Sequence, residues 1–167
     1  LITSVAEEFQ VLMQEEHLKF VSQLEGELSI HADREKIRRM LINLLDNAIR
    51  YNQPGGEIVC RAEMDERQVI LTLANTGPGI EPDDQARVFD QFYRCEKSRA
   101  TARGGSGLGL TIVKRIVELH GGSITVESSG NCAPTQEPSG RMALAKTPEP
   151  RSHSWCPTPA ASTPIKL

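Results

Sequence analysis

Apolar side chains recur at helical spacing in three stretches of the chain. In residues 4–15, Val5, Phe9, Leu12 and Met13 fall on one side, which predicts an amphipathic helix. A second helix is predicted from an N-cap at Asp33 to the turn at residues 54–56. Its apolar face is formed by Ile37, Met40, Leu41, Leu44, Leu45 and Ala48. A third helix is predicted between a glycine-rich turn and Gly121, with Ile112, Val113, Ile116, Val117 and Leu119 on its apolar face.

Other stretches alternate apolar and polar positions, as half-buried strands do. Residues 57–64 and 68–73 each place apolar side chains on one face, and the short link between them predicts a β-hairpin. Shorter strands are predicted at 18–20, which could pair with 28–30, and at 123–127. Because one face of the sheet is apolar and helices are available to cover it, we predict an α/β two-layer sandwich, with a mixed sheet and helices on one face.

Composition narrows the classes of partner. The formal net charge of −3 gives no electrostatic footprint for nucleic acid or for an anionic membrane surface. The sequence has no apolar run long enough to span a bilayer and no signal peptide, and since it begins at Leu1 we expect it to be part of a larger protein. The four cysteines have neither metal-ligand nor redox spacing, which favours reduced thiols in the cytoplasm.

The second predicted helix carries a polar stripe at the edge of its apolar face. Asn43, Asn47 and Arg50 form the stripe, and Tyr51 lies between it and the apolar face. One interpretation is a pair of solvated or capped amides. The other is a ligand site, in which amide oxygens offer hard ligands to Mg²⁺ and the arginine faces phosphate.

Two glycine-rich segments lie further along the chain. Residues 75–80 place two glycines around a proline, which allows the backbone to approach a flat ligand, although an ordinary loop has the same composition. Residues 104–110 open the third helix, where free N–H groups and the helix dipole suit phosphate. This second segment is neither a Walker A loop nor a GxGxxG turn.

Two segments have no clear periodicity. Residues 81–103 are rich in charge and hold an aromatic cluster at 89–94, which predicts a mobile lid with an anchor; the alternative is a surface helix whose phenylalanines join the core. From Ser129 onward the chain holds seven of its ten prolines, and we predict a disordered tail.

Taken together, these segments resemble, over residues 1–127, the catalytic ATP-binding domain of two-component sensor histidine kinases. The wider superfamily includes the ATPase domains of DNA gyrase, heat-shock chaperones and mismatch-repair proteins. The resemblance implies a Bergerat-type ATP-binding fold at 1–128, followed by the tail at 129–167. The nucleotide site that it implies comprises Asn43, Asn47, Arg50, Tyr51, Asn75, Gly77, Gly79, Ile80, Phe92, Arg94, Gly105, Ser106, Gly107, Leu108, Gly109 and Leu110.

The resemblance also implies roles. Asn47 is expected to coordinate Mg²⁺ with support from Asn43, and together with Arg50 these are the implied catalytic residues. Arg50 and Tyr51 are expected to contact phosphate and flank the nucleotide. Asn75 stands where the family has an aspartate that accepts from the adenine amino group. Arg94 is the expected basic contact of the lid, and the backbone of residues 105–110 is expected to hold the phosphates.

Two departures from the family pattern stand out. The sequence has no phosphoacceptor histidine motif, and His31 and His120 are more easily explained as structural. The family's last strand follows shortly after the strand at 123–127, but residues 129–134 do not resemble it. From this we predict that the sheet lacks one strand.

Three functions remain open. The first is a protein-histidine kinase domain, cytoplasmic within a parent protein anchored in the bacterial inner membrane. Its partners would be ATP, the parent's histidine-bearing dimerisation domain and a downstream response regulator, with no nucleic acid and no membrane contact. The second is an ATP-hydrolysing switch, disfavoured because such domains carry a glutamate at the position of Asn43 to activate water. The third is a nucleotide-binding module without catalysis.

Overall fold

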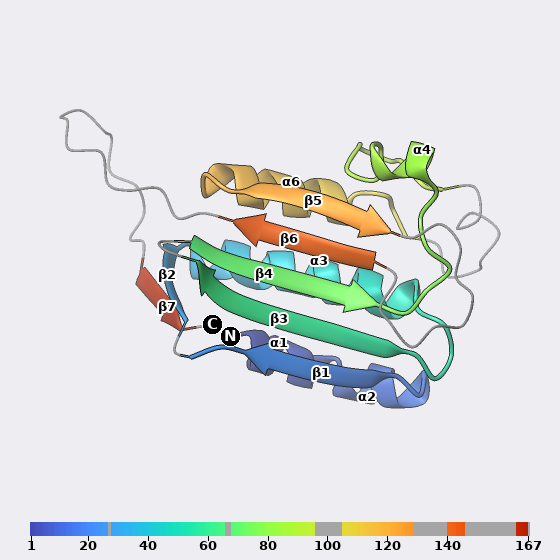
Figure 1. Ribbon diagram of the computed structural model, residues 1–167, viewed down its shortest axis with the longest axis horizontal. Coiled ribbons are helices and arrows are strands. Elements are labelled where there is room, and N and C mark those ends of the chain that lie inside the picture. Colours follow the sequence, from blue (N-terminus) through green and yellow to red (C-terminus); the bar gives the residue numbers. More distant parts are fainter. Residues whose placement is uncertain (27, 66–67, 96–104, 129–139, 146–162, 167) are drawn as a thin grey trace.

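The structure is a computed structural model that describes residues 1–26, 28–65, 68–95, 105–128, 140–145 and 163–166. Among these residues no helix is long and apolar enough to cross a membrane. The helices and strands, labelled in Figure 1, are α1 (Ile2–Glu8), α2 (Gln10–Glu15), β1 (Lys19–Leu24), β2 (Ser29–Ala32), α3 (Arg34–Arg50), β3 (Glu57–Asp65), β4 (Gln68–Asn75), α4 (Pro82–Gln85), α6 (Gly109–Leu119), β5 (Ser123–Ser128), β6 (Gly140–Ala145) and β7 (Thr163–Lys166).

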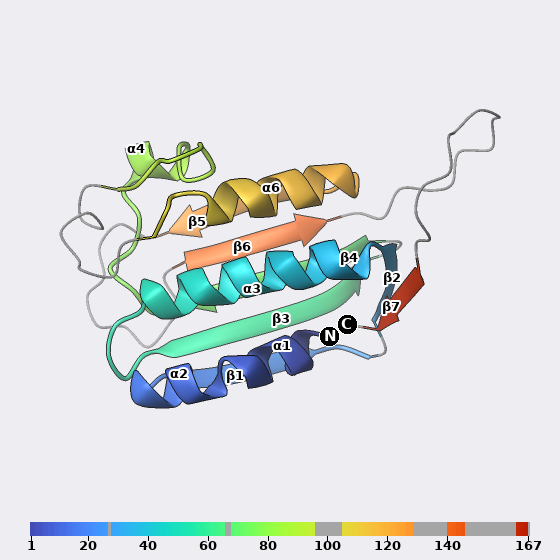
Figure 2. The same cartoon turned by 180° about the vertical axis from the view of Figure 1, so that it is seen from behind.

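The main sheet has five strands in the order β1-β3-β4-β6-β5. β1 runs parallel to β3, and the other neighbouring pairs are antiparallel. Seen from behind in Figure 2, α1, α3 and α6 lie across the same face of this sheet. The predicted two-layer arrangement, a mixed sheet with helices on one face, is therefore confirmed. β2 and β7 form a separate two-stranded sheet at one end.

The core lies between α3 and the sheet. All six residues of the predicted apolar face of α3 are buried, and the predicted N-cap is present, since Asp33 accepts from the backbone N–H of Lys36. Opposite them, Ile58, Cys60 and Ala62 project from β3 and are almost fully buried. Burial raises the pKa of the Cys60 thiol to about 11, so this cysteine is protonated and unreactive at neutral pH.

Most local predictions are confirmed. The hairpin has the register Asp65↔Gln68, next to the predicted short link, and β5 occupies the predicted strand at 123–127. The first helix is interrupted: α1 and α2 are separated at Phe9, and Leu12 is 38% exposed rather than part of the buried side.

Two predictions about the sheet are wrong. The strand near residue 20 pairs with β3 and not with residues 28–30, because β2 leaves the main sheet and pairs with β7. The sheet also has the strand that was expected to be absent, because β6 fills the position between β4 and β5, with Leu144 opposite both Leu71 and Ile124. Part of the predicted tail thus forms strands, while 129–139 and 146–162 lie outside the described residues.

Candidate functional site

The polar edge of α3 meets the first residue of α6. A Cβ atom on Gly109 would lie 3.2 Å from Oδ1 of Asn43 and 3.7 Å from Nδ2 of Asn47. The Asn43 amide is oriented by its own helix, because its Nδ2 donates to the carbonyl of Arg39 at 2.7 Å. Glycine at position 109 therefore lets a helix N-terminus approach two side-chain amides. An amide oxygen and free N–H groups consequently face one space.

Arg50 brings a positive charge to the same place. Its guanidinium makes two contacts with the carboxylate of Asp46, at 2.9 and 3.0 Å, one helical turn earlier. Its Nη1 lies 3.7 Å from the position of a Cβ on Gly105, within the glycine-rich turn. The side chain is 26% exposed, so Arg50 is held beside the turn with part of its surface open to solvent.

The loop after β4 packs against the end of α3. Nδ2 of Asn75 donates to the carbonyl oxygen of Tyr51 at 3.2 Å. A Cβ on Gly77 would lie only 2.3 Å from that same oxygen, so glycine is required for this approach. Gly79 has φ +73°, a conformation that also favours glycine. Asn75 and Gly77 thus join the loop to Tyr51 at the C-terminal end of α3.

A buried hydrogen-bond network behind this loop was not found from the sequence. The hydroxyl of Thr76, which is 7% exposed, donates to Oδ1 of Asn52 at 2.8 Å and accepts from the N–H of Glu57 at 2.7 Å. Gly56 leaves the room for these groups, because its Cβ would lie 2.2 Å from both Asn52 Oδ1 and Thr76 Oγ1. The network fixes the loop to the start of β3. Only the preference of threonine and asparagine for turns hinted at it.

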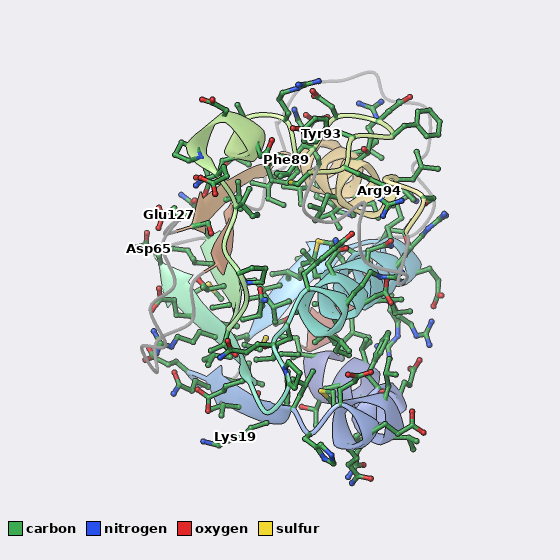
Figure 3. All side chains as sticks on the ribbon, turned by 90° about the vertical axis from the view of Figure 1, so that its right-hand side faces the viewer. Lys19, Asp65, Phe89, Tyr93, Arg94 and Glu127 are labelled. Carbon is green, nitrogen blue, oxygen red and sulfur yellow. The ribbon has the colours of Figure 1, made fainter. Side chains whose placement is uncertain are left out.

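The aromatic segment lies beside the glycine-rich turn. The N–H of Phe92 donates to the carbonyl of Gly107 at 3.1 Å, and Thr111 on α6 donates to the carbonyl of Phe89 at 3.0 Å. In Figure 3, Phe89, Tyr93 and Arg94 lie at the end of the molecule that carries α4 and the start of α6, above α3. The ring of Phe92 is 68% exposed, so it does not join the core. Residues 96–103 of the predicted lid lie outside the described residues, and the lid stays a prediction.

The remaining predicted residues have simpler surroundings. Ile80 donates its N–H to Oγ of Ser128 at 2.8 Å, which links the loop to the end of β5. Leu108 precedes α6 and accepts from the N–H of Ile112, while Leu110 packs on the core. Ser106 is exposed and Arg94 is half-buried. The structure thus brings the α3 amides, Arg50 and the glycine-rich turn together, with the Asn75 loop held at Tyr51.

The residues present fit a hard divalent cation bound with a phosphate ligand. No cluster of three His, Cys, Asp or Glu side chains that could hold a metal occurs in the described part of the chain. The α3 amides lie next to the glycine-rich turn, with Oδ1 of Asn43 and Nδ2 of Asn47 nearest to Gly109, and each amide has one neutral oxygen that can serve as a ligand. A site of this kind suits Mg²⁺, which keeps several waters and takes ligands from a substrate phosphate.

Comparison with known proteins gives a consistent result. A family model described as histidine kinase-, DNA gyrase B- and HSP90-like ATPase matches residues 32–146. Sensor histidine kinase RppB of Synechocystis is 38% identical over 130 residues, which are 77% of this chain and 29% of RppB. This chain therefore spans less than a third of that relative.

Solved structures of sensor kinases are also similar. The mycobacterial sensor histidine kinase MprB has a TM-score of 0.72 and 28% identity, over 86% of this chain and 92% of MprB. Full-length ShkA in complex with AMPPNP has a TM-score of 0.71 and 26% identity, over 88% of this chain and 29% of ShkA. The neighbours include histidine kinase catalytic domains, and the fold is of the predicted Bergerat type.

Proposed function

Because this chain belongs to the family of histidine kinase-, DNA gyrase B- and HSP90-like ATPases, we propose that it is the ATP-binding catalytic domain of a sensor histidine kinase. The observation that carries the proposal is the approach of Gly109 to Asn43 and Asn47, with Arg50 beside Gly105. In this arrangement two side-chain amides, the Arg50 guanidinium and the N-terminus of α6 surround one space. The similarity to RppB, and to ShkA bound to AMPPNP, supports the same conclusion.

The base of ATP would bind beside the Asn75 loop. Gly77 lets this loop lie close to the Tyr51 carbonyl, and Gly79 lets it turn with a positive φ. Because neither residue has a side chain, a flat ring could lie against the loop backbone. Nδ2 of Asn75 donates to the carbonyl of Tyr51, which orients the side chain, and the amide oxygen of Asn75 would accept from the adenine amino group. Tyr51 would flank the nucleotide at the end of α3.

The phosphates would bind at the start of α6. The backbone N–H groups of residues 105–110 and the helix dipole favour anionic oxygens there. Arg50 adds a charge-assisted contact, since its guanidinium already lies beside Gly105. Asn47, with support from Asn43, would hold Mg²⁺, which neutralises negative charge on the phosphates when it is bound.

Catalysis by this chain would consist of positioning and electrostatic stabilisation. The γ-phosphoryl group would pass to a histidine on a separate dimerisation domain of the parent protein, and from there to a response regulator. Hydrolysis by the isolated chain is disfavoured, because an amide at Asn43 cannot take a proton from water. We further propose that the domain is cytoplasmic and that its parent is anchored in a membrane.

Calorimetric titration with ATP, with and without Mg²⁺, tests the nucleotide site. We expect saturable binding that Mg²⁺ strengthens, and we expect Asn47→Ala to remove most of the effect of the metal. Gln14→Ala is the matched control, because Gln14 is an exposed amide on α2. Absence of ATP binding by the folded chain would contradict the proposal. Binding that Asn47→Ala leaves unchanged would remove Asn47 from the metal site.

A further inference from the structure

A polar contact outside the proposed nucleotide site holds the segment that follows α4. The hydroxyl of Tyr93 donates to Oδ1 of Asp84 at 2.5 Å, and the guanidinium carbon of Arg87 lies 4.3 Å from the centre of the tyrosine ring. Both partners come from residues 84–87, in and just after α4. A charge-assisted hydrogen bond and a cation–π contact therefore fix the same half-buried side chain from two sides.

The backbone next to Tyr93 is in close contact with the glycine-rich turn. The N–H of Phe92 donates to the carbonyl of Gly107. A Cβ on Gly107 would lie 2.9 Å from Cα and C of Phe92, and 3.0 Å from the carbonyl oxygen of Tyr93. Gly107 has φ +72°, and Phe92, which is not a glycine, has φ +62°. Since Phe92 prefers other conformations, its surroundings must hold it in place.

α4 is itself attached to the loop on the other side of the site. Nε2 of Gln85 donates to the carbonyls of Ile80 and Ser128, each at 2.9 Å. Ile80 in turn donates to Oγ of Ser128. α4 is thus tied to the Asn75–Ile80 loop through Gln85 and to the glycine-rich turn through Tyr93.

We infer that Tyr93, fixed by Asp84, is a positioning residue that holds the glycine-rich turn at Gly107 in the conformation that binds phosphate. The inference rests on the proposed function, because it assumes that this turn receives the phosphates of ATP. Tyr93 acts through the backbone of Phe92 and Gly107 and need not touch the nucleotide. Loss of the anchor should therefore weaken binding of the phosphates more than binding of the base.

The test compares ATP with adenosine, which shares the base and lacks phosphates. In Tyr93→Phe and in Asp84→Ala, we expect the Kd for ATP to rise roughly threefold to tenfold, as for loss of a partly exposed hydrogen bond to a charged group. The Kd for adenosine should stay within about twofold. Asp84→Asn keeps an accepting oxygen and should have a smaller effect than Asp84→Ala. Asp83→Ala is the matched control, because Asp83 is an exposed carboxylate in the same helix.

A double-mutant cycle shows whether the two residues act together. If Asp84 acts through the Tyr93 hydroxyl, Asp84→Ala combined with Tyr93→Phe should raise the Kd for ATP no further than the larger single effect. Asp83→Ala should leave that Kd unchanged in either background. If the double variant instead raised the Kd for ATP by the product of the two single fold-changes, the residues would act independently and the inference would be overturned. Proportional weakening of ATP and adenosine together with a lower thermal midpoint would show a merely structural role and would also overturn it.

Amide hydrogen exchange provides a readout that does not depend on nucleotide. Tyr93→Phe should speed exchange of the Phe92 N–H, the donor to Gly107, by roughly tenfold if the anchor holds that bond closed. Unchanged exchange at Phe92 would overturn the inference. Failure of the unaltered protein to bind ATP would contradict the proposed function, and the exchange of Phe92 would then decide separately whether Tyr93 fixes the turn.

Discussion

Gly109 begins α6 directly against the side chain of Asn43, with 3.2 Å between Oδ1 of Asn43 and the place where a Cβ on Gly109 would lie. Asn43 cannot move away without cost, because its Nδ2 is bonded to the carbonyl of Arg39. The close approach of Gly109 to Asn43 therefore depends on glycine at position 109 and on the fixed orientation of the Asn43 amide. Two helices far apart in the sequence meet there, and the side-chain amides of α3 face the N-terminus of α6.

The first prediction separates the stability of α6 from binding at its N-terminus. Gly109→Ala should change the thermal midpoint little, because the preference of a helix for alanine over glycine, up to about 1 kcal/mol in a helix interior, is offset by the cost of displacing the Asn43 amide. The same change should weaken MgATP binding several-fold, because the methyl group displaces the Asn43 amide. Differential scanning fluorimetry and calorimetry measure the two effects. Lys114→Ala, at an exposed position of α6, should change neither, and unaltered MgATP affinity in Gly109→Ala would contradict the account.

The second prediction concerns Asn75, whose amide N–H faces the carbonyl of Tyr51. Asn75→Asp replaces this donor with an oxygen, so at neutral pH the free energy of unfolding should fall by about 1 kcal/mol. Because the carbonyl disfavours the charged form, the pKa of the new carboxyl should be raised, and protonation at acid pH should restore a donor. The loss of stability relative to the parent should therefore shrink as the pH falls. Urea unfolding at pH 7 and pH 4 measures it, and a loss that grows at pH 4 would contradict this explanation.

The third prediction concerns the other end of the α3–α6 pair. Nε2 of His120 accepts from the backbone N–H of Asp33 at 3.1 Å, and its Nδ1 lies 2.7 Å from the carbonyl of Ile116. These contacts require neutral imidazole with the proton on Nδ1, and they agree with the structural role predicted for this histidine. His120→Ala should lower the free energy of unfolding by about 1–3 kcal/mol, the sum of two hydrogen bonds. Chemical denaturation measures this, with exposed His31→Ala as the control.

The fourth prediction is a pH dependence at Tyr93. The hydrogen bond to Asp84 raises the pKa of the phenol, because ionisation would remove the donor and place two negative charges together. The contact is thus fully present below the ordinary tyrosine pKa of about 10 and is lost as the pH rises through the higher folded value. Absorbance titration in a Tyr51→Phe background isolates this residue, since the chain has two tyrosines. Asp84→Ala should lower the midpoint, and an unmoved midpoint would show that Asp84 is not the cause.

Local patterns predicted most elements, because each depends on its own residues. The spacing of Ile37 to Ala48 and the cap at Asp33 were sufficient for α3, and alternation was sufficient for the β3–β4 hairpin. Strand partners could not be predicted in the same way. β6 pairs with Leu71–Asn75, some 70 residues earlier in the chain, and is separated from β5 by residues 129–139, so nothing local marks it. For the same reason β1 was assigned the wrong neighbour.

In the candidate site, too, local patterns predicted single segments but not the contacts between them. The polar stripe of α3 and the glycine-rich turn could be recognised separately, and the family resemblance related them. Their supporting contacts were not predictable, because they join residues whose spacing has no repeating pattern. Tyr93 bonds to Asp84 across nine positions and Thr76 to Asn52 across 24, and neither separation is a repeat of a helix or a strand.

In the proposed function, this chain delivers the γ-phosphoryl group of ATP to a histidine on another domain. The most direct measurement mixes the chain with γ-labelled ATP, Mg²⁺ and the histidine-bearing dimerisation domain of its parent protein. We predict an acid-labile label on that domain, little label on the chain itself, little free phosphate, and loss of transfer in Asn47→Ala. Rapid release of phosphate by the chain alone would favour a hydrolysing switch, and bound ATP without any transfer to the partner would contradict the kinase assignment.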